Sequence, residues 1–297
     1  MAEETKIGWC RNSDGTAGAT FNPWCGCSKV SPGCDLCYAE TWSRRAGKDV
    51  WGPGVPRQRT TEANWRQPLK WDAAAAKKGI RQRIFCASLA DVFDNEVPQE
   101  WRDDLWALIR KAPNCDWIIV TKRIGNAPKM LPADWGDGYP NVWLCATVVN
   151  QTEADRDIPK LLAVQAAVHG LSIEPMLVPI NLTRIDPGIF AASANALTGI
   201  WKWDGGPSRK ESAALNWVKI GGESGANGRS MDIASVRDLL RQTRAAGVAT
   251  YVKQLGRNPE LNGAAYPVTG KGDDSAEWPE DIRVQEVPLT GTMKLAA

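Results

Sequence analysis

Residues 99–121, QEWRDDLWALIRKAPNCDWIIVT, join a helical pattern to a buried strand. Within residues 99–111 apolar side chains recur every three or four positions, the period of an amphipathic helix, and Pro113 follows the end of the pattern. Residues 116–121 are a short apolar run rich in β-branched side chains, typical of a strand covered on both faces. A helix followed so closely by such a strand predicts an α/β fold with a parallel sheet.

The same strand pattern recurs along the chain. We predict further strands at residues 83–88, 141–147, 168–173, 217–220 and 249–253, and a short first strand near residues 19–22. Helices are predicted at residues 39–46, 154–167 and 232–246. This alternation predicts a partial or full parallel (β/α) barrel, with a doubly wound sheet as the alternative. In both folds, reactive residues are expected at the carboxyl ends of the strands.

Two stretches interrupt the alternation. Residues 47–72 are rich in Gly, Pro and Trp, and residues 186–214 form a long insertion that contains two further tryptophans. We expect residues 1–256 to form one barrel domain that carries these two insertions. Residues 257–297 are expected to be a loosely packed C-terminal extension, because the tail after Gly270 is acidic and shows little periodicity.

The composition restricts the compartment and the chemistry. The 297 residues carry a net charge of +2, with eight cysteines and one histidine. No apolar run is long enough to span a membrane and no signal-peptide pattern follows Met1, so we expect a cytoplasmic protein with no membrane partner. Cysteines in that compartment more often bind metals or perform chemistry than form disulfides. Because His169 is the only histidine, zinc sites built on two or three histidines are excluded.

Four of the cysteines lie in residues 25–37, CGCSKVSPGCDLC. Their four thiolates could hold one tetrahedral zinc ion. Alternatively, Cys27, Cys34 and Cys37 could bind three irons of a four-iron cluster, leaving the fourth iron open to a ligand from outside the protein. Free thiols or a disulfide are a third reading of the same residues. The spacing alone leaves these alternatives open.

The sequence around the cysteines resembles a known family. Residues 22–40, NPWCGCSKVSPGCDLCYAE, resemble the signature of a phage and prophage family of three-cysteine proteins of uncertain function. That family is similar to radical S-adenosylmethionine (SAM) enzymes of the spore photoproduct lyase type. The resemblance extends over roughly residues 20–256 and includes the motifs at residues 88–93, 121–123, 140–143, 171–175, 220–225 and 252–254.

The resemblance implies a barrel of the radical SAM type and an enzyme with two cofactors. Cys27, Cys34 and Cys37 would hold a [4Fe–4S] cluster, and SAM would bind its open iron. An electron from an external donor would then generate a 5′-deoxyadenosyl radical, which abstracts a hydrogen atom from the substrate. The cysteine spacing is longer than the common one, and Cys25 stands where the family more often has a residue without a thiol.

Polar residues near the strand ends are the candidates for binding and catalysis. For SAM we expect Ser88 and Asp91, with Thr147 and Asn150 for a ribose and Tyr38 beside the last cysteine. The Gly-Gly-Glu sequence at residues 221–223 follows a strand too late in the chain for the SAM-binding role that the family gives to such a sequence. The catalytic candidates are Lys122, Arg123, Glu174, Glu223 and Lys253. Their alternative roles are surface charges and structural ion pairs.

Residues 38–83 suggest a substrate class. This segment has eleven Lys or Arg and four Asp or Glu, a local net charge of +7, with Trp42, Trp51, Trp65 and Trp71 interleaved. Cations and aromatic faces bind phosphates and bases, whereas a solvated face with core tryptophans is the alternative. The phage association favours modification or repair of a nucleobase in DNA or RNA, or of a nucleotide. The alternative functions are a zinc-stabilised nucleic-acid-binding protein without catalysis and a radical SAM enzyme acting on a peptide or protein.

Overall fold

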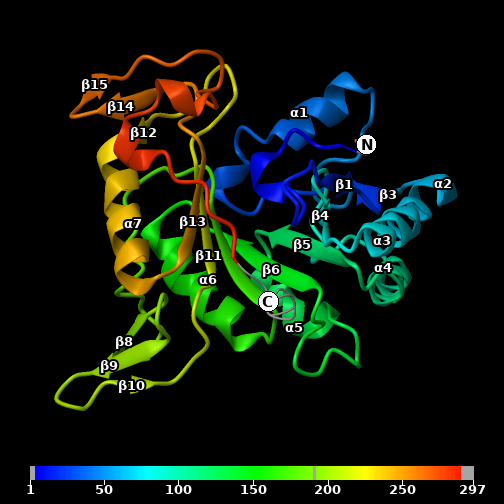
Figure 1. The fold of residues 1–297 in the computed structure, drawn as a ribbon, viewed down its shortest axis with the longest axis horizontal. Coiled ribbons are helices and arrows are strands. Elements are labelled where there is room, and N and C mark those ends of the chain that lie inside the picture. Colours follow the sequence, from blue (N-terminus) through cyan, green and yellow to red (C-terminus); the bar gives the residue numbers. More distant parts are fainter. Residues whose placement is uncertain (1–3, 190–191, 289–297) are drawn as a thin grey trace. The chain divides into compact units, whose positions relative to one another are not determined.

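The computed structural model describes residues 4–189 and 192–288. Its main feature is a seven-stranded parallel sheet with the order β1-β4-β5-β6-β7-β11-β13 (Figure 1). The strands are β1 (Ala19–Phe21), β4 (Gln82–Cys86), β5 (Cys115–Thr121), β6 (Val142–Thr147), β7 (Val168–Ile173), β11 (Trp217–Gly221) and β13 (Ala249–Gln254). Spatial order follows chain order, and β1 and β13 each have one neighbour. The prediction of an α/β fold with a partial (β/α) barrel is therefore confirmed, because a doubly wound sheet would reverse its strand order.

The helices lie between these strands. They are α1 (Tyr38–Arg45), α2 (Glu62–Trp65), α3 (Gln67–Lys78), α4 (Gln99–Lys111), α5 (Ala127–Met130), α6 (Gln151–Ala163) and α7 (Ile233–Ala246). Helix α6 begins and ends earlier than predicted. Asn150 accepts a bond from the backbone N–H of Glu153, and the Glu153 carboxylate accepts one from Val149, so the helix starts here. Helix α3 starts inside the predicted insertion, with Pro68 in the first turn, where a missing N–H costs nothing.

The chain divides into two compact units. Unit 1 is Met1–Cys145 with Val164–Ala167, and unit 2 is Ala146–Ala163 with Val168–Ala297. The division falls within strand β6. No helix among the described residues has the length and apolar character needed to cross a membrane.

Unit 1 contains strands β1, β4 and β5. Ala19 is in register with Ile84, and Ile84 with Trp117, so the three strands are parallel neighbours. Phe21 contacts the rings of Trp65 and Trp117 edge-on, which links the sheet to α2. Helices α3 and α4 lie side by side in this unit (Figure 1). A two-stranded antiparallel pair, β2 (Trp24–Cys25) and β3 (Gln58–Arg59), follows the end of β1.

Unit 2 contains strands β7, β11 and β13, which are also parallel neighbours. Helix α7 starts at Asp232, whose carboxylate accepts bonds from the backbone of Ala234 and Ser235, and it ends at Gly247 with a φ of 66°. Two small sheets complete the unit. The first is β8 (Ala192–Asn195), β9 (Ile200–Trp203) and β10 (Arg209–Lys210); the second is β12 (Met231–Asp232), β14 (Pro259–Leu261) and β15 (Ala264–Ala265). The first sheet gives regular structure to the predicted insertion at residues 186–214.

The described part of the C-terminal segment, residues 257–288, packs against unit 2. Trp278 is 1% exposed and Ile282 is fully buried. The backbone N–H of Val252 donates to the carbonyl oxygen of Val284 over 2.8 Å, so the segment runs along β13. The sequence suggested loose packing because its acids dominate the composition. The burial of these two apolar side chains helps to anchor the segment despite that composition.

Candidate functional site

The cysteine loop follows the two-residue strand β2. Cys25 belongs to that strand, is buried and pairs with Gln58. Cys27, Cys34 and Cys37 lie beyond the strand and are partly accessible free thiols. The loop turns at Pro32–Cys34, where the Ser31 hydroxyl accepts a bond from the backbone of Gly33, and Cys37 precedes α1. Cys25 therefore differs from the other three cysteines in being buried within a strand.

Backbone contacts fix the start of this loop. The carbonyl oxygen of Cys27 accepts a bond from the N–H of Gly52 over 2.9 Å. Gly26 has a φ of 112°, and a Cβ atom there would lie 2.3 Å from the carbonyl oxygen of Val50. Only glycine allows so close a crossing at this backbone conformation. Residues 50–52, at the start of the first predicted insertion, thus hold Cys27 from one side.

Burial raises the pKa of the Cys27 thiol to about 12, and the nearby carboxylates Asp91 and Asp94 add to the effect. The guanidinium of Arg123 opposes it by charge and by hydrogen bonding. Cys27 is therefore a neutral thiol at pH 7 when nothing is bound, and a metal would have to displace its proton.

Three cysteines of this loop are the residues that could hold a metal centre. Among the described residues, no group of three or more His, Cys, Asp or Glu side chains is placed to hold one metal ion. A four-iron cluster makes a different demand, because each thiolate ligates its own iron. Cys27, Cys34 and Cys37 provide three free thiols on one loop, which is the donor set that such a cluster needs.

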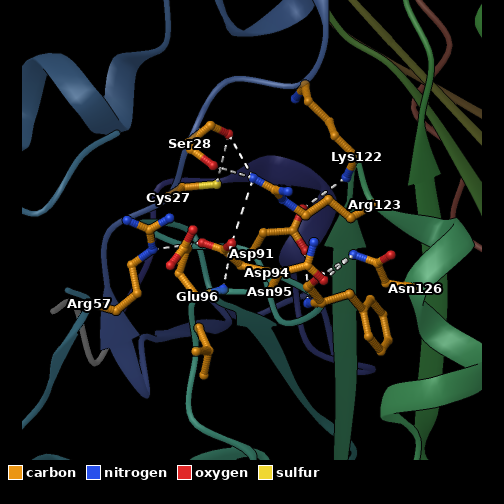
Figure 2. A network of polar contacts seen from close by, with 12 residues as sticks. Cys27, Ser28, Arg57, Asp91, Asp94, Asn95, Glu96, Lys122, Arg123 and Asn126 are labelled. Atoms are coloured by element: carbon orange, nitrogen blue, oxygen red, sulfur yellow. Dashed lines mark hydrogen bonds and ion pairs between the residues drawn. The ribbon is translucent and has the colours of Figure 1, made fainter. Parts of the chain in front are cut away.

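A buried charge network lies beside Cys27 (Figure 2). Asp94 accepts a bond from Arg57 Nε over 2.7 Å, and both side chains are fully buried. Arg123, which follows β5, lies 3.6 Å from the other oxygen of Asp94. The same Arg123 nitrogen donates to the Ser28 hydroxyl (2.6 Å) and carbonyl (3.0 Å). Asp94 therefore links Arg57 to Arg123, and Arg123 in turn holds Ser28, the residue after Cys27.

Arg57 holds the first insertion in the same way. Its Nη1 donates to the carbonyl oxygens of Gly52 (3.0 Å) and Val55 (2.7 Å).

Burial lowers the pKa of Arg123, but Asp94, Cys27 and Asp91 more than offset this, so the pKa of Arg123 is raised and the side chain stays charged. The sequence reasoning missed Arg57, Asp94 and Ser28 as parts of the site. Asp94 follows the Ser88–Phe93 motif directly, which was the one signal available.

Asp91 lies deeper than a ligand-binding role requires. Its side chain is buried and accepts bonds from the Thr121 hydroxyl (2.7 Å) and the backbone N–H groups of Lys122 (3.0 Å) and Phe93 (2.9 Å). Burial raises its pKa, and these bonds oppose the rise. Asp91 thus ties the loop after β4 to the end of β5. The Asp91 carboxylate, which we expected to face SAM, therefore accepts hydrogen bonds from the protein itself.

Ser88 and Tyr38 meet at the end of β4. The Tyr38 hydroxyl donates to the carbonyl oxygen of Ser88 over 2.6 Å, and Asn22 donates to the Ser88 hydroxyl over 3.0 Å. Tyr38 follows the last cysteine, so this bond attaches the end of the cysteine loop to the sheet.

Lys122 is half-buried, makes no ion pair among the described residues, and extends away from Asp91 and Asp94 (Figure 2).

Two of the predicted catalytic residues form an ion pair within unit 2. Lys253, in β13, donates to the carboxylate of Glu174, which follows β7. Gln254 donates to the same carboxylate over 3.4 Å and to the carbonyl oxygen of Gly222 over 2.8 Å. A Cβ atom on Gly221 would lie 3.4 Å from Glu174, so the glycine leaves room for this arrangement. The ion-pair alternative given for Glu174 describes this geometry.

Glu223 is committed to a neighbour in unit 2. It is buried, and one carboxylate oxygen accepts bonds from Arg229 Nε (3.0 Å) and from the Arg229 backbone (2.7 Å). A Cβ atom on Gly222 would lie 2.3 Å from the carbonyl oxygen of Leu255. Gly222 therefore serves the close crossing of two chain segments.

The remaining candidate residues are buried in strands or cap a helix. Thr147 ends β6 and is buried, and Asn150 caps α6 as described above. His169 is buried at the start of β7, away from the carboxyl end of the strand. Unit 1 therefore carries the three cysteines, Tyr38, Ser88, Asp91, Lys122 and Arg123. Unit 2 carries Thr147, Asn150, Glu174, Glu223 and Lys253.

The four tryptophans of the basic segment, residues 38–83, differ in their exposure to solvent. Trp65 is buried in the core, and Trp51 and Trp71 are partly buried. Trp42 is the exposed tryptophan of the four. Trp65 is therefore a core tryptophan, whereas Trp42 has an exposed ring on which a base could stack.

A family model described as "Protein of unknown function (DUF5131)" matches residues 4–280. No curated protein and no solved structure matches the chain.

Proposed function

The chain belongs to the DUF5131 family of proteins of unknown function, and for this member we propose a radical SAM-type enzyme that modifies or repairs a nucleobase or nucleotide. Cys27, Cys34 and Cys37 would hold its [4Fe–4S] cluster. The observation that carries the proposal is the bond from Arg123 to Ser28. It attaches the three-cysteine loop to the carboxyl end of β5, the edge where (β/α) barrels hold their reactive groups.

Three contacts give the loop its position on this edge. Arg123 holds the residue after Cys27, and Tyr38 attaches the residue after Cys37 to Ser88 beyond β4. The third contact is the backbone bond from Gly52 to Cys27. Ligands on a loop fixed at both ends lose little freedom when a metal binds, which favours binding.

Charge around the loop supports the same role. Arg123 is positive beside Cys27 and partly offsets the rise in that thiol's pKa, and the same positive charge would favour the bound thiolate. Lys122 brings a second positive charge to the end of β5, and it would bind an anionic group of SAM or of the substrate. When bound, the cluster and SAM would supply the one-electron chemistry that starts hydrogen abstraction, with electrons from an external donor.

Cysteine variants test the cluster directly. After anaerobic reconstitution with iron and sulfide, Cys27→Ala, Cys34→Ala and Cys37→Ala should each lose most of the bound iron and the visible cluster absorption. Cys25→Ala is the matched control from the same segment, and it should keep both, because Cys25 lies in β2.

The opposite pattern would favour another function. Tight binding of one zinc ion that depends equally on all four cysteines would contradict the cluster. It would favour the zinc-stabilised nucleic-acid-binding protein. Iron binding and SAM cleavage with a peptide or protein as the only substrate would replace the nucleobase part of the proposal alone.

A further inference from the structure

Exposed apolar side chains gather on the cysteine loop and helix α1. Val30 and Leu36 are exposed on the loop, and Tyr38 and Trp42 are 56% and 45% exposed on the helix. Helix α1 buries Ala39, Glu40 and Ser43. Its outward face therefore presents Tyr38, Trp42 and Arg45, at the spacing of successive helical turns. Two aromatic rings on a solvent-facing helix surface are unusual, because such a face is ordinarily polar.

Positive charge accompanies the aromatic rings. Arg45 and Lys48 form no ion pair with any acidic side chain among the described residues, and Lys48 Nζ lies 5.9 Å from the Trp42 ring centre. The other two cations of this segment differ, because Lys29 and Arg44 both pair with Glu40. The cations left without a carboxylate are therefore the two that lie beside Trp42.

We infer that this α1 surface, defined as Tyr38, Trp42, Arg45 and Lys48, binds a single-stranded or flipped-out stretch of nucleic acid. The inference rests on the proposed function and narrows its substrate from a nucleobase or nucleotide to a strand. Bases stack on aromatic faces whatever their sequence, and Lys and Arg neutralise the phosphates between them.

The length of the surface favours a strand over a free nucleotide. Tyr38 and Arg45 are seven residues apart on the helix, which is roughly 10 Å along its axis. That distance accommodates two or three nucleotides of a single strand, whereas one nucleotide would contact only part of it. The surface also begins at Tyr38, next to Cys37, so a bound strand would pass the cysteine loop.

The chemistry of the surface favours nucleic acid over a protein partner. Lysine is depleted in protein interfaces, whereas here Lys48 lies over the Trp42 ring. The hydroxyl bond to Ser88 holds the Tyr38 ring in place while the ring stays exposed. A fixed aromatic ring loses little conformational freedom when a base stacks on it.

Fluorescence anisotropy tests the inference with the full chain and labelled single-stranded DNA and RNA of mixed sequence, without added iron, SAM or reductant. Wild-type binding should strengthen as salt falls. Trp42→Ala should weaken it roughly tenfold, and Trp42→Phe should restore most of the affinity. Arg45→Ala and Lys48→Ala should each reduce the slope of log affinity against log salt by roughly 0.7.

Matched controls come from exposed positions on other helices of unit 1. Leu69→Ala removes an exposed apolar side chain of α3, and Lys111→Ala removes an exposed cation of α4; both should bind strands as wild type does. Absence of strand binding, or equal binding by wild type, Trp42→Ala and Arg45→Ala, would overturn the inference. So would self-association that Trp42→Ala abolishes without any effect on strand binding. Strand binding by a protein that takes up no iron would contradict the proposed function alone.

Discussion

At the residue scale, Asp94 is the centre of the site in unit 1. Its two carboxylate oxygens approach two guanidinium groups, Arg57 at 2.7 Å and Arg123 at 3.6 Å. The pair with Arg57 has no solvent exposure, so neither charge has water to replace its partner. Removing one member of such a pair leaves a buried charge without compensation. Asp94 therefore controls both the stability of unit 1 and the position of the cysteine loop.

We predict that Asp94→Asn lowers the free energy of unfolding by roughly 3 kcal/mol or more. Urea denaturation of the variant and the wild type measures the difference. The matched control is Asp104→Asn, because Asp104 pairs with Arg59 at the surface. That change should cost less than about 1 kcal/mol. Similar small losses in the two variants would contradict the role given to the buried pair.

The sequence indicated some of these residues and not others. The three-cysteine motif and Arg123 were found because they stand in a motif or next to a strand end. Asp91 was found too, but burial and three hydrogen bonds give it a structural task. Arg57 was counted as one of eleven basic residues, since no local pattern distinguishes a buried arginine from a solvated one. Its partner lies 37 residues further along the chain.

At the element scale, the parallel strands were predicted well because burial on both faces gives continuous apolar runs. The elements that were missed have weaker patterns. Helix α3 contains a run of alanines and follows a stretch rich in Gly and Pro, and the strands β8, β9 and β10 are short. Where β11 and β13 end, glycines let two chain segments cross, and this packing has no periodic signal in the sequence.

Gly222→Ala should destabilise the protein by roughly 2 kcal/mol, because its Cβ atom would lie 2.3 Å from the carbonyl oxygen of Leu255. Thermal denaturation monitored by circular dichroism measures the effect. Gly225→Ala, three residues away, is the control: a Cβ atom there meets nothing within 4 Å, and the change should stay within about 0.5 kcal/mol of wild type. Equal melting temperatures for the two variants would refute the crossing as the reason for this glycine.

At the scale of the whole molecule, composition was the least reliable guide. The local charge of residues 38–83 includes cations whose carboxylate partners lie outside that segment: Arg57 pairs with Asp94, Arg59 with Asp104 and Arg81 with Asp116. Such pairing depends on the tertiary fold, so counting charges overestimates the cations that can bind phosphates. The acidic C-terminal segment misled in a similar way, because its packing depends on Trp278 and Ile282 and not on its average composition.

Trp278→Ala tests whether the C-terminal segment is integral to unit 2. The buried indole donates to the carbonyl oxygen of Gly272 over 3.0 Å, and its loss should cost roughly 3 kcal/mol or more. Chemical denaturation gives the energy, and limited proteolysis should then cleave the variant within residues 257–288. A variant as stable and as protease-resistant as wild type would mean that the segment is only loosely attached.

The proposed function requires that the loop attached by Arg123 to β5 holds a cluster that cleaves SAM. Its most direct test is the formation of 5′-deoxyadenosine from SAM by the anaerobically reconstituted protein under a strong reductant. We predict that wild type and Cys25→Ala form this product and that Cys27→Ala does not. A wild-type protein that binds three to four irons per chain but forms no 5′-deoxyadenosine would contradict the claim.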